Sequence, residues 1–143
     1  IDDKSSLISF YNTHIPVHIK QYLFFKPRTQ LRYIKERFTL RQKVTAEILE
    51  ELDNNKNPKL LSGDFNTQTL QPLIYKFFKR FHEAFRDTFC GIPRTINVWG
   101  INAWRIDFVF LDKLMAINSS IVDPIGLSDH SGQLVEVILP SQI

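Results

Sequence analysis

The chain has 143 residues, of which 43% are apolar and 23% are charged. This length suits one domain with a hydrophobic core and is too short for two ordinary domains, and the composition excludes a disordered chain. No apolar run approaches the ~20 residues that a membrane-spanning helix needs. The chain begins Ile-Asp-Asp-Lys, without a methionine or the apolar core of a signal peptide, so its localisation stays open.

The net charge of +3 is unevenly distributed. Basic residues recur from Lys20 to Lys43, and within that stretch only Glu36 opposes them. Such a segment attracts phosphates, nucleic acid or an anionic membrane surface, or else forms an ordinary solvated face of the protein. The charge pattern therefore does not select a substrate.

The first predicted strand is the short apolar segment 7–11, which is rich in residues that favour β-structure. Residues 15–38 then follow no clear period, because Pro16 and Pro27 interrupt them and aromatic residues alternate with basic ones. We expect this segment to be an irregular basic insertion.

The first predicted helix begins at Thr39, which can form a capping box with Gln42. Apolar residues then recur at helical spacing as far as Leu52, and the turn-forming run 53–58 ends the pattern. A short strand is expected over 59–62. A second helix is expected from the proline that follows Gln71, and its apolar stripe comprises Phe77, Phe78 and Phe81.

Glycine, proline and asparagine in residues 88–103 predict a loop, and strands are expected over 105–112 and 133–139, with one short strand between them. A polar loop over 126–132 precedes the last of these strands. The order of elements predicts an α/β fold, in which helices flank a mixed sheet.

Several polar residues fall where the predicted strands begin or end, which is where α/β folds carry their chemistry. These residues are His14, Asp64, Asn66, Asp107, Asp129 and His130. They could converge on one pocket, or they could be unrelated caps and turn residues. Asp107 is the hardest to explain as a turn residue, because an acid inside an apolar strand needs a partner.

Four short motifs contain these residues: Asn12-Thr13-His14, Ser62-Gly63-Asp64-Phe65-Asn66, Trp104-Arg105-Ile106-Asp107-Phe108-Val109-Phe110 and Leu127-Ser128-Asp129-His130. In this order and spacing they resemble the endonuclease/exonuclease/phosphatase superfamily, whose members include deoxyribonucleases, apurinic endonucleases, sphingomyelinases and inositol polyphosphate phosphatases. The resemblance extends over nearly the whole chain, from Leu7 to Leu139.

The resemblance implies a role for each position. Asp64 corresponds to the carboxylate that activates water, and Asn66 to the residue that orients nucleophile and phosphate. His130 corresponds to the histidine that contacts the phosphate, and Asp107 to the acid paired with it. His14 corresponds to a second histidine at the phosphate in several branches of the superfamily.

The resemblance also implies a cofactor, Mg²⁺ or alternatively Mn²⁺, with Asp129 and Asp64 associated with the metal site. The substrate would be a phosphoester, whether nucleic acid, a lipid headgroup or a sugar phosphate. Trp99 and Trp104 lie where the superfamily carries substrate-selecting loops. They are candidates for substrate contact, with core packing as the alternative.

The complete superfamily domain is about twice this length, a four-layer sandwich of two sheets with helices outside. Residues 1–143 correspond to its C-terminal part, and the glutamate that is the principal metal ligand has no counterpart here. We therefore expect the sheet to carry an apolar face that is covered by an N-terminal half or by a second copy. A fragment that serves only binding or assembly is the alternative to an enzyme.

Overall fold

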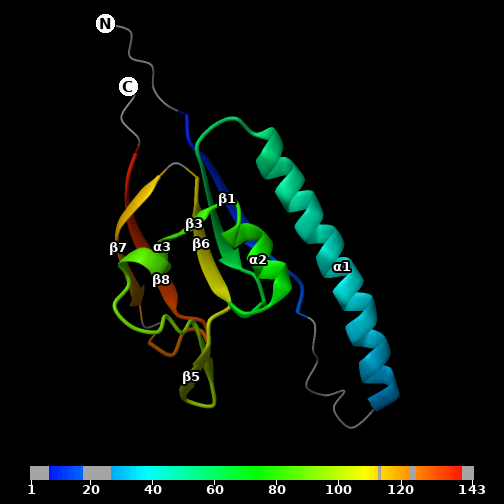
Figure 1. Ribbon diagram of the computed structural model, residues 1–143. Coiled ribbons are helices and arrows are strands. Elements are labelled where there is room, and N and C mark those ends of the chain that lie inside the picture. The colour runs from blue at the N-terminus through cyan, green and yellow to red at the C-terminus, as the bar shows by residue number, and fades with distance from the viewer. Residues whose placement is uncertain (1–6, 18–26, 113, 123–124, 140–143) are drawn as a thin grey trace, which may run out of the picture.

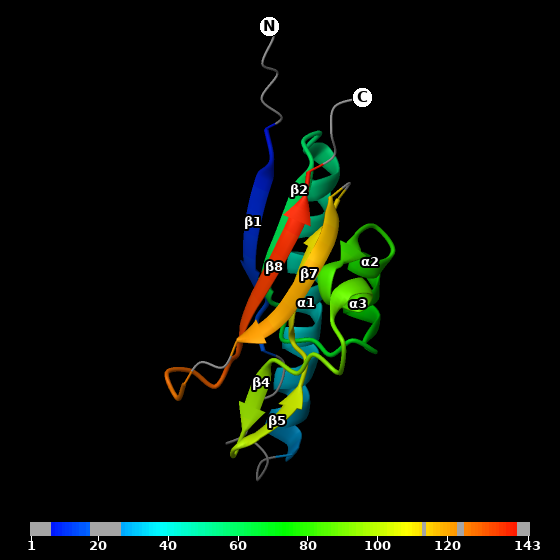
Figure 2. The same cartoon turned by 90° about the vertical axis from the view of Figure 1, so that its left-hand side faces the viewer.

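The computed structural model describes residues 7–17, 27–112, 114–122 and 125–139. They form three layers, which Figure 1 shows edge-on: a two-stranded sheet, a central four-stranded sheet, and two helices on its far side. A separate small hairpin extends below the central sheet (Figures 1 and 2). The predicted α/β class with a mixed sheet flanked by helices is confirmed.

The central sheet has the strand order β1-β2-β6-β3. Its strands are β1 (Ser9–His14), β2 (Lys59–Asp64), β6 (Asp107–Leu111) and the two-residue β3 (His82–Glu83). β1 runs parallel to β2, whereas β6 is antiparallel to both β2 and β3. The carboxyl ends of β1 and β2 therefore meet the amino end of β6 at one edge of the sheet.

Two helices cover one face of this sheet: α1 (Pro27–Asn54) and α2 (Pro72–Phe78) (Figure 1). Phe65 is fully buried at the centre of this layer, and its ring packs edge-to-face against Phe77, Phe108 and Phe110 at centroid distances of 5.1, 5.6 and 5.4 Å. Such pairs add to the burial of apolar area. This aromatic cluster anchors the chain immediately after β2.

The opposite face of the central sheet packs against the antiparallel pair β7 (Met115–Val122) and β8 (Gly132–Ile138), and against the short helix α3 (Ala84–Thr88). Alternate residues of the pair point inward, among them Ala116, Val135 and Val137. They pack against a second cluster of buried apolar residues that includes Val109 and Leu111 of β6. The two sheets thus face each other across an apolar layer, as in a sandwich.

The remaining strands, β4 (Ile96–Val98) and β5 (Ile101–Trp104), form a hairpin. The backbone before and within β4 pairs with the loop that leads to β8: the Ser131 amide donates to Thr95 O at 2.8 Å, and the Asn97 amide donates to Asp129 O at 2.7 Å. The predicted loop over 88–103 is therefore wrong for the part that forms this hairpin.

The expectation of an irregular insertion over 15–38 is also wrong where the structure describes the segment from residue 27 onward. α1 begins at Pro27, because proline is well tolerated in the first turn of a helix, where its missing N–H costs nothing. Thr39 lies inside this helix, and its hydroxyl donates to Lys35 O at 3.3 Å instead of capping a helix start. Residues 18–26 of the predicted insertion lie outside the described part.

The outer face of the β7–β8 pair exposes apolar side chains, among them Met115, Leu134 and Ile138. Phe10 on β1 is 72% exposed as well. The expected apolar face is thus present, although Asn118 and Glu136 interrupt it. What covers it, an N-terminal half or a second copy, stays a prediction.

In the described part of the chain, no helix combines the length and the apolar character that crossing a membrane requires.

Candidate active site

The candidate site lies where β1 and β2 end and β6 begins. In the strand register His14 is opposite Asp64, and Asp64 is opposite Asp107, so the three residues form one row across the sheet. Residues directly opposite one another point to the same face of a sheet. Here that is the face that packs against β7 and β8.

Gly63 allows β1 and β2 to approach each other just before this row. Its φ of +141° is rarely adopted by other residues, and a Cβ built on it would lie 1.9 Å from Thr13 O. A position with both properties accepts only glycine. The Gly-Asp pair in the sequence therefore reflects a close contact between strands as well as chemistry.

Asp64 is held by the turn that follows it. Its Oδ1 accepts a hydrogen bond from the Asn66 amide at 2.7 Å, and its Oδ2 accepts one from Asn66 Nδ2 at 2.9 Å. The same side-chain amide also donates to Ile15 O at 2.9 Å, across to the chain that leaves β1. Asn66 has a φ of +46°, which asparagine tolerates better than most residues.

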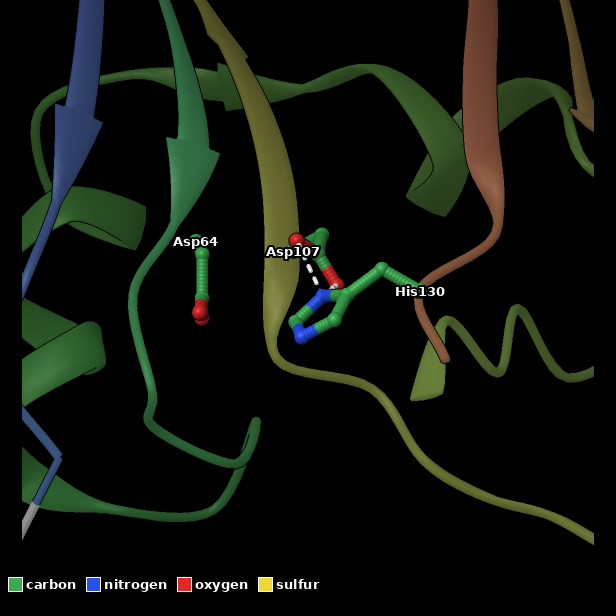
Figure 3. A group of neighbouring side chains, drawn as sticks. All are labelled: Asp64, Asp107 and His130. Atoms are coloured by element: carbon green, nitrogen blue, oxygen red, sulfur yellow. Dashed lines mark hydrogen bonds and ion pairs between the residues drawn. The ribbon is translucent and has the colours of Figure 1, made fainter. Parts of the chain in front are cut away.

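Asp107 and His130 form a pair. Nδ1 of His130 lies 3.2 and 3.1 Å from the two carboxylate oxygens of Asp107 (Figure 3). The pairing leaves Nε2 as the ring nitrogen available to a substrate. Figure 3 shows that Asp64 and this pair come from neighbouring strands and from the loop before β8.

Hydrogen bonds hold the backbone around both Asp107 and His130. Thr95 is fully buried, and its hydroxyl oxygen accepts from the amides of Ile106 at 3.2 Å and Asp107 at 3.1 Å. The His130 amide donates to Ser128 Oγ at 3.0 Å, and Gln133 Nε2 donates to Asp107 O at 3.2 Å. The loop before β8 is thereby fixed to the start of β6.

Burial raises the pKa of the Asp107 carboxyl above its ordinary value. Hydrogen bonding to Thr95 and the attraction of His130 lower that pKa, while the negative charge of Asp64 raises it. The net rise means that burial outweighs these attractions, so ionising Asp107 is costly even with His130 beside it.

Asp64, Asp107 and His130 each offer one ligand atom, and these atoms lie within 4.8 Å of one another. Carboxylate oxygens are the ligands that hard cations such as Mg²⁺ and Mn²⁺ prefer, whereas imidazole suits softer metals better. The two carboxylates thus fit such a cation, and the described residues contain an acidic cluster that could hold a metal ion.

The other predicted site residues lie at different distances from this cluster. His14 is close, with Nε2 3.6 Å from Asp64 Oδ2, but its side chain is 76% exposed. Asp129 is exposed and lines a separate pocket of about 760 Å³ with Asn97, Asn102 and Ser131. Its side chain is not part of the cluster of three, and its role as a metal ligand stays a prediction.

The two tryptophans belong to the β4–β5 hairpin. Trp99 sits at the turn with a φ of +53° and is 94% exposed, and Trp104 is 49% exposed. Neither is buried in the described part of the structure, so the core-packing alternative fails for Trp99. Contact with substrate stays a prediction for both.

Reasoning from the sequence missed Arg41, which is only 3% exposed and lies behind the Asp64–Asn66 turn. The sequence places it among the basic residues of the segment 20–43, several of which are exposed on α1, such as Arg32 and Lys43. The signal was available, because Arg41 precedes Thr45, Ile48 and Leu52 at helical spacing, on the face that α1 buries.

Residues 5–130 match the model of the Endonuclease/Exonuclease/phosphatase family. No curated protein sequence matches the chain.

Several solved structures share the fold at low sequence identity. An endonuclease/exonuclease/phosphatase family protein from Bacteroides thetaiotaomicron is 21% identical with a TM-score of 0.62, covering 93% of this chain and 51% of that one. A functionally unknown conserved protein from Enterococcus faecalis V583 is 22% identical with a TM-score of 0.61, covering 90% and 49%.

A mannosyl-6-phosphatase from Bacteroides thetaiotaomicron is 20% identical with a TM-score of 0.57, covering 91% of this chain and 51% of that one. The chain therefore spans about half the length of the structures that it resembles. With the family match extending from residue 5 to residue 130, the chain belongs to the Endonuclease/Exonuclease/phosphatase family.

Proposed function

We propose that this protein hydrolyses a phosphoester with the help of a divalent metal ion. The observation that carries the proposal is the meeting of Asp64, Asp107 and His130 at one end of the central sheet, each held by its own hydrogen bonds. Phosphoester cleavage needs an activated water and stabilisation of negative charge on the phosphate oxygens. These residue types supply both.

Asp64 is the proposed base. Its oxygens are fixed by two bonds from Asn66 and keep lone pairs that can accept a proton from the attacking water. His130, oriented through Nδ1 by Asp107, would donate from Nε2 to a phosphate oxygen. His14, which is exposed beside Asp64, would offer a second donor to the phosphate.

A metal ion, Mg²⁺ or Mn²⁺, would be held by carboxylate oxygens of Asp64 and Asp107 and would neutralise charge on the phosphate. Asp129 is a further proposed ligand from outside this cluster. Asn66 holds the Asp64 carboxylate in one orientation through two hydrogen bonds.

The substrate class is left broad. The family includes endonucleases, exonucleases and phosphatases, and one of the similar structures is a mannosyl-6-phosphatase, which supports phosphoester hydrolysis in general. The exposed Trp99 has room to contact a base, a sugar or a lipid headgroup.

The proposed pair is tested by His130→Gln, Asp107→Asn and the double variant in the full-length protein. Each single change is expected to lower kcat by about 10²–10⁴-fold, because proton donation to the phosphate is lost or misdirected. The kcat of the double variant should be close to that of the less active single variant, since the two residues act as one unit. Steady-state kinetics on a phosphoester with an aryl leaving group measures all three.

His82→Gln is the matched control, because His82 is an exposed histidine in β3, away from the cluster. Its kcat should equal that of the unaltered protein. If the fold-loss of kcat in the double variant equals the product of the two single losses, Asp107 and His130 act separately. Unchanged kcat in all variants would remove the assignment and favour a module that binds without catalysis.

A further inference from the structure

We propose that Arg41 is a positioning residue that fastens the chain after β1 to the chain after β2 and so sets where His14, Asp64 and Asn66 stand relative to one another. This inference rests on the proposed hydrolysis at the same site. In this role the buried Arg41 acts through the backbone and Thr67 and does not touch the side chains of Asp64, Asp107 or His130.

Arg41 bonds to both chain segments at once. Its Nη1 donates to Pro16 O at 2.6 Å, on the segment that leaves β1 just after His14. Its Nη2 donates to the hydroxyl of Thr67 and, at 3.5 Å, to Phe65 O, on the segment that contains Asn66. The planar fork of a guanidinium holds two such partners in a fixed relation, which a lysine ammonium does not.

The same two segments are linked on their other side. The Ile15 amide donates to Asp64 O at 2.8 Å, and Asn66 Nδ2 donates to Ile15 O at 2.9 Å. Thr67 is 1% exposed, and its hydroxyl donates to Phe65 O at 2.6 Å while it accepts from Arg41. The guanidinium thus adds a second set of hydrogen bonds between the two segments, on the side of the Asp64–Asn66 turn opposite the first.

The cost of burying Arg41 argues that the residue has a task. Its hydrogen-bond partners are two carbonyl oxygens and a hydroxyl, all neutral, and no carboxylate of the described residues lies within ion-pair distance of it. Desolvation lowers the pKa of the guanidinium, and the charge of Asp64 raises it. A buried cation without a paired anion is costly, and an apolar residue there would pack more cheaply.

The position of Arg41 in α1 fits this task. The helix runs alongside the site end of the central sheet (Figure 1), and Arg41 occupies its buried face with Thr45 and Leu52. A pocket of about 220 Å³ lies beside it, lined by Phe38, Gln71 and Lys76 among others, and leads to the surface. A small cation can therefore reach the place of the guanidinium if the side chain is removed.

The test compares Arg41→Lys, Arg41→Met and Thr67→Val in the full-length protein, with Thr67→Ser as the control that keeps the hydroxyl. Because the reacting groups shift when the fork is lost, kcat per folded molecule should fall by about 10–100-fold in Arg41→Met. KM should change far less than kcat. Arg41→Lys should recover little, although it keeps the charge, since one ammonium cannot replace the fork.

Chemical rescue separates positioning from plain stability. Millimolar methylguanidinium added to Arg41→Ala should restore part of kcat, whereas methylammonium should not. Thr67→Val should lower kcat in the same direction as Arg41→Met, and Thr67→Ser should not. Thr67→Val decides the question if the Arg41 variants do not fold.

The two proposals fail in different ways. If the unaltered protein hydrolyses phosphoesters and loses that activity with Asp64→Asn, but folded Arg41→Met and Thr67→Val keep kcat within about twofold, the positioning role is wrong and the proposed function stands. Full activity in Arg41→Lys would mean that the charge alone matters, which also contradicts the role. If the unaltered protein hydrolyses nothing, the proposed function fails first and the role fails with it.

Discussion

Asp64→Asn is expected to lower kcat for phosphoester hydrolysis by about 10²–10⁴-fold while leaving the fold intact. The amide has nearly the same shape as the carboxylate, and its oxygen can still accept one of the two hydrogen bonds from Asn66, whereas its NH2 group cannot accept the other. It cannot take a proton from water, and it is a poorer ligand for a hard cation. The variant therefore removes the chemistry at Asp64 and keeps one of the two bonds that hold the turn.

The comparison is steady-state kinetics together with a thermal unfolding scan of each protein. Asp53→Asn is the matched control, because Asp53 is a surface acid that pairs with Arg80 at 3.4 Å at the end of α1. Surface ion pairs contribute little to stability, so this variant should match the unaltered protein in both measurements. An Asp64→Asn protein with more than about a tenth of the original kcat would assign the base to another residue.

Gly63→Ala is expected to lower the free energy of unfolding by about 4 kcal/mol or more, which places it among the most damaging kinds of substitution. The added methyl group would lie 1.9 Å from Thr13 O and 2.8 Å from Thr13 N, both of them backbone atoms. β1 and β2 would have to separate next to His14 and Asp64. Denaturant unfolding followed by circular dichroism measures the loss.

Gly100→Ala shows how much of the loss in Gly63→Ala comes from backbone strain and how much from the clash with Thr13. Gly100 also has a left-handed φ, +83°, but nothing lies within 4 Å of a Cβ built there. Its substitution should cost only the conformational strain, about 1–2 kcal/mol. Equal losses at Gly63 and Gly100 would show that the close approach of β1 and β2 contributes nothing.

The pattern of the sequence predicts polar residues near the ends of strands, whereas their convergence on one site was implied only by the resemblance to the superfamily. Ser62-Gly63-Asp64 ends β2, and Asp107 begins β6 between the apolar residues Ile106 and Phe108. Pairing of neighbouring strands then brings Asp64 opposite Asp107. Local patterns of this kind need no knowledge of distant contacts, so they can be predicted from sequence.

What failed depends on contacts between distant parts of the chain. The run of basic residues in the segment 20–43 does not distinguish Arg41 from its neighbours, but Arg41 is buried because its partners Pro16 and Thr67 come from elsewhere in the chain. The sequence also misplaces the start of α1, because a proline can either interrupt a helical pattern or begin it, and Pro27 begins it. The β4–β5 hairpin was missed because its strands are short, and backbone bonds to residues 129 and 131 hold it in place.

The most direct test of the account is hydrolysis of aryl phosphate monoesters and diesters by the full-length protein, with Mg²⁺, with Mn²⁺ and with EDTA, beside Asp64→Asn. The account predicts hydrolysis of at least one class that requires the metal ion and is lost in the variant. Hydrolysis that persists in EDTA, or that survives in Asp64→Asn, would contradict the proposed role of the Asp64, Asp107 and His130 cluster. A folded protein that hydrolyses neither class with either metal ion would contradict the proposed enzyme itself.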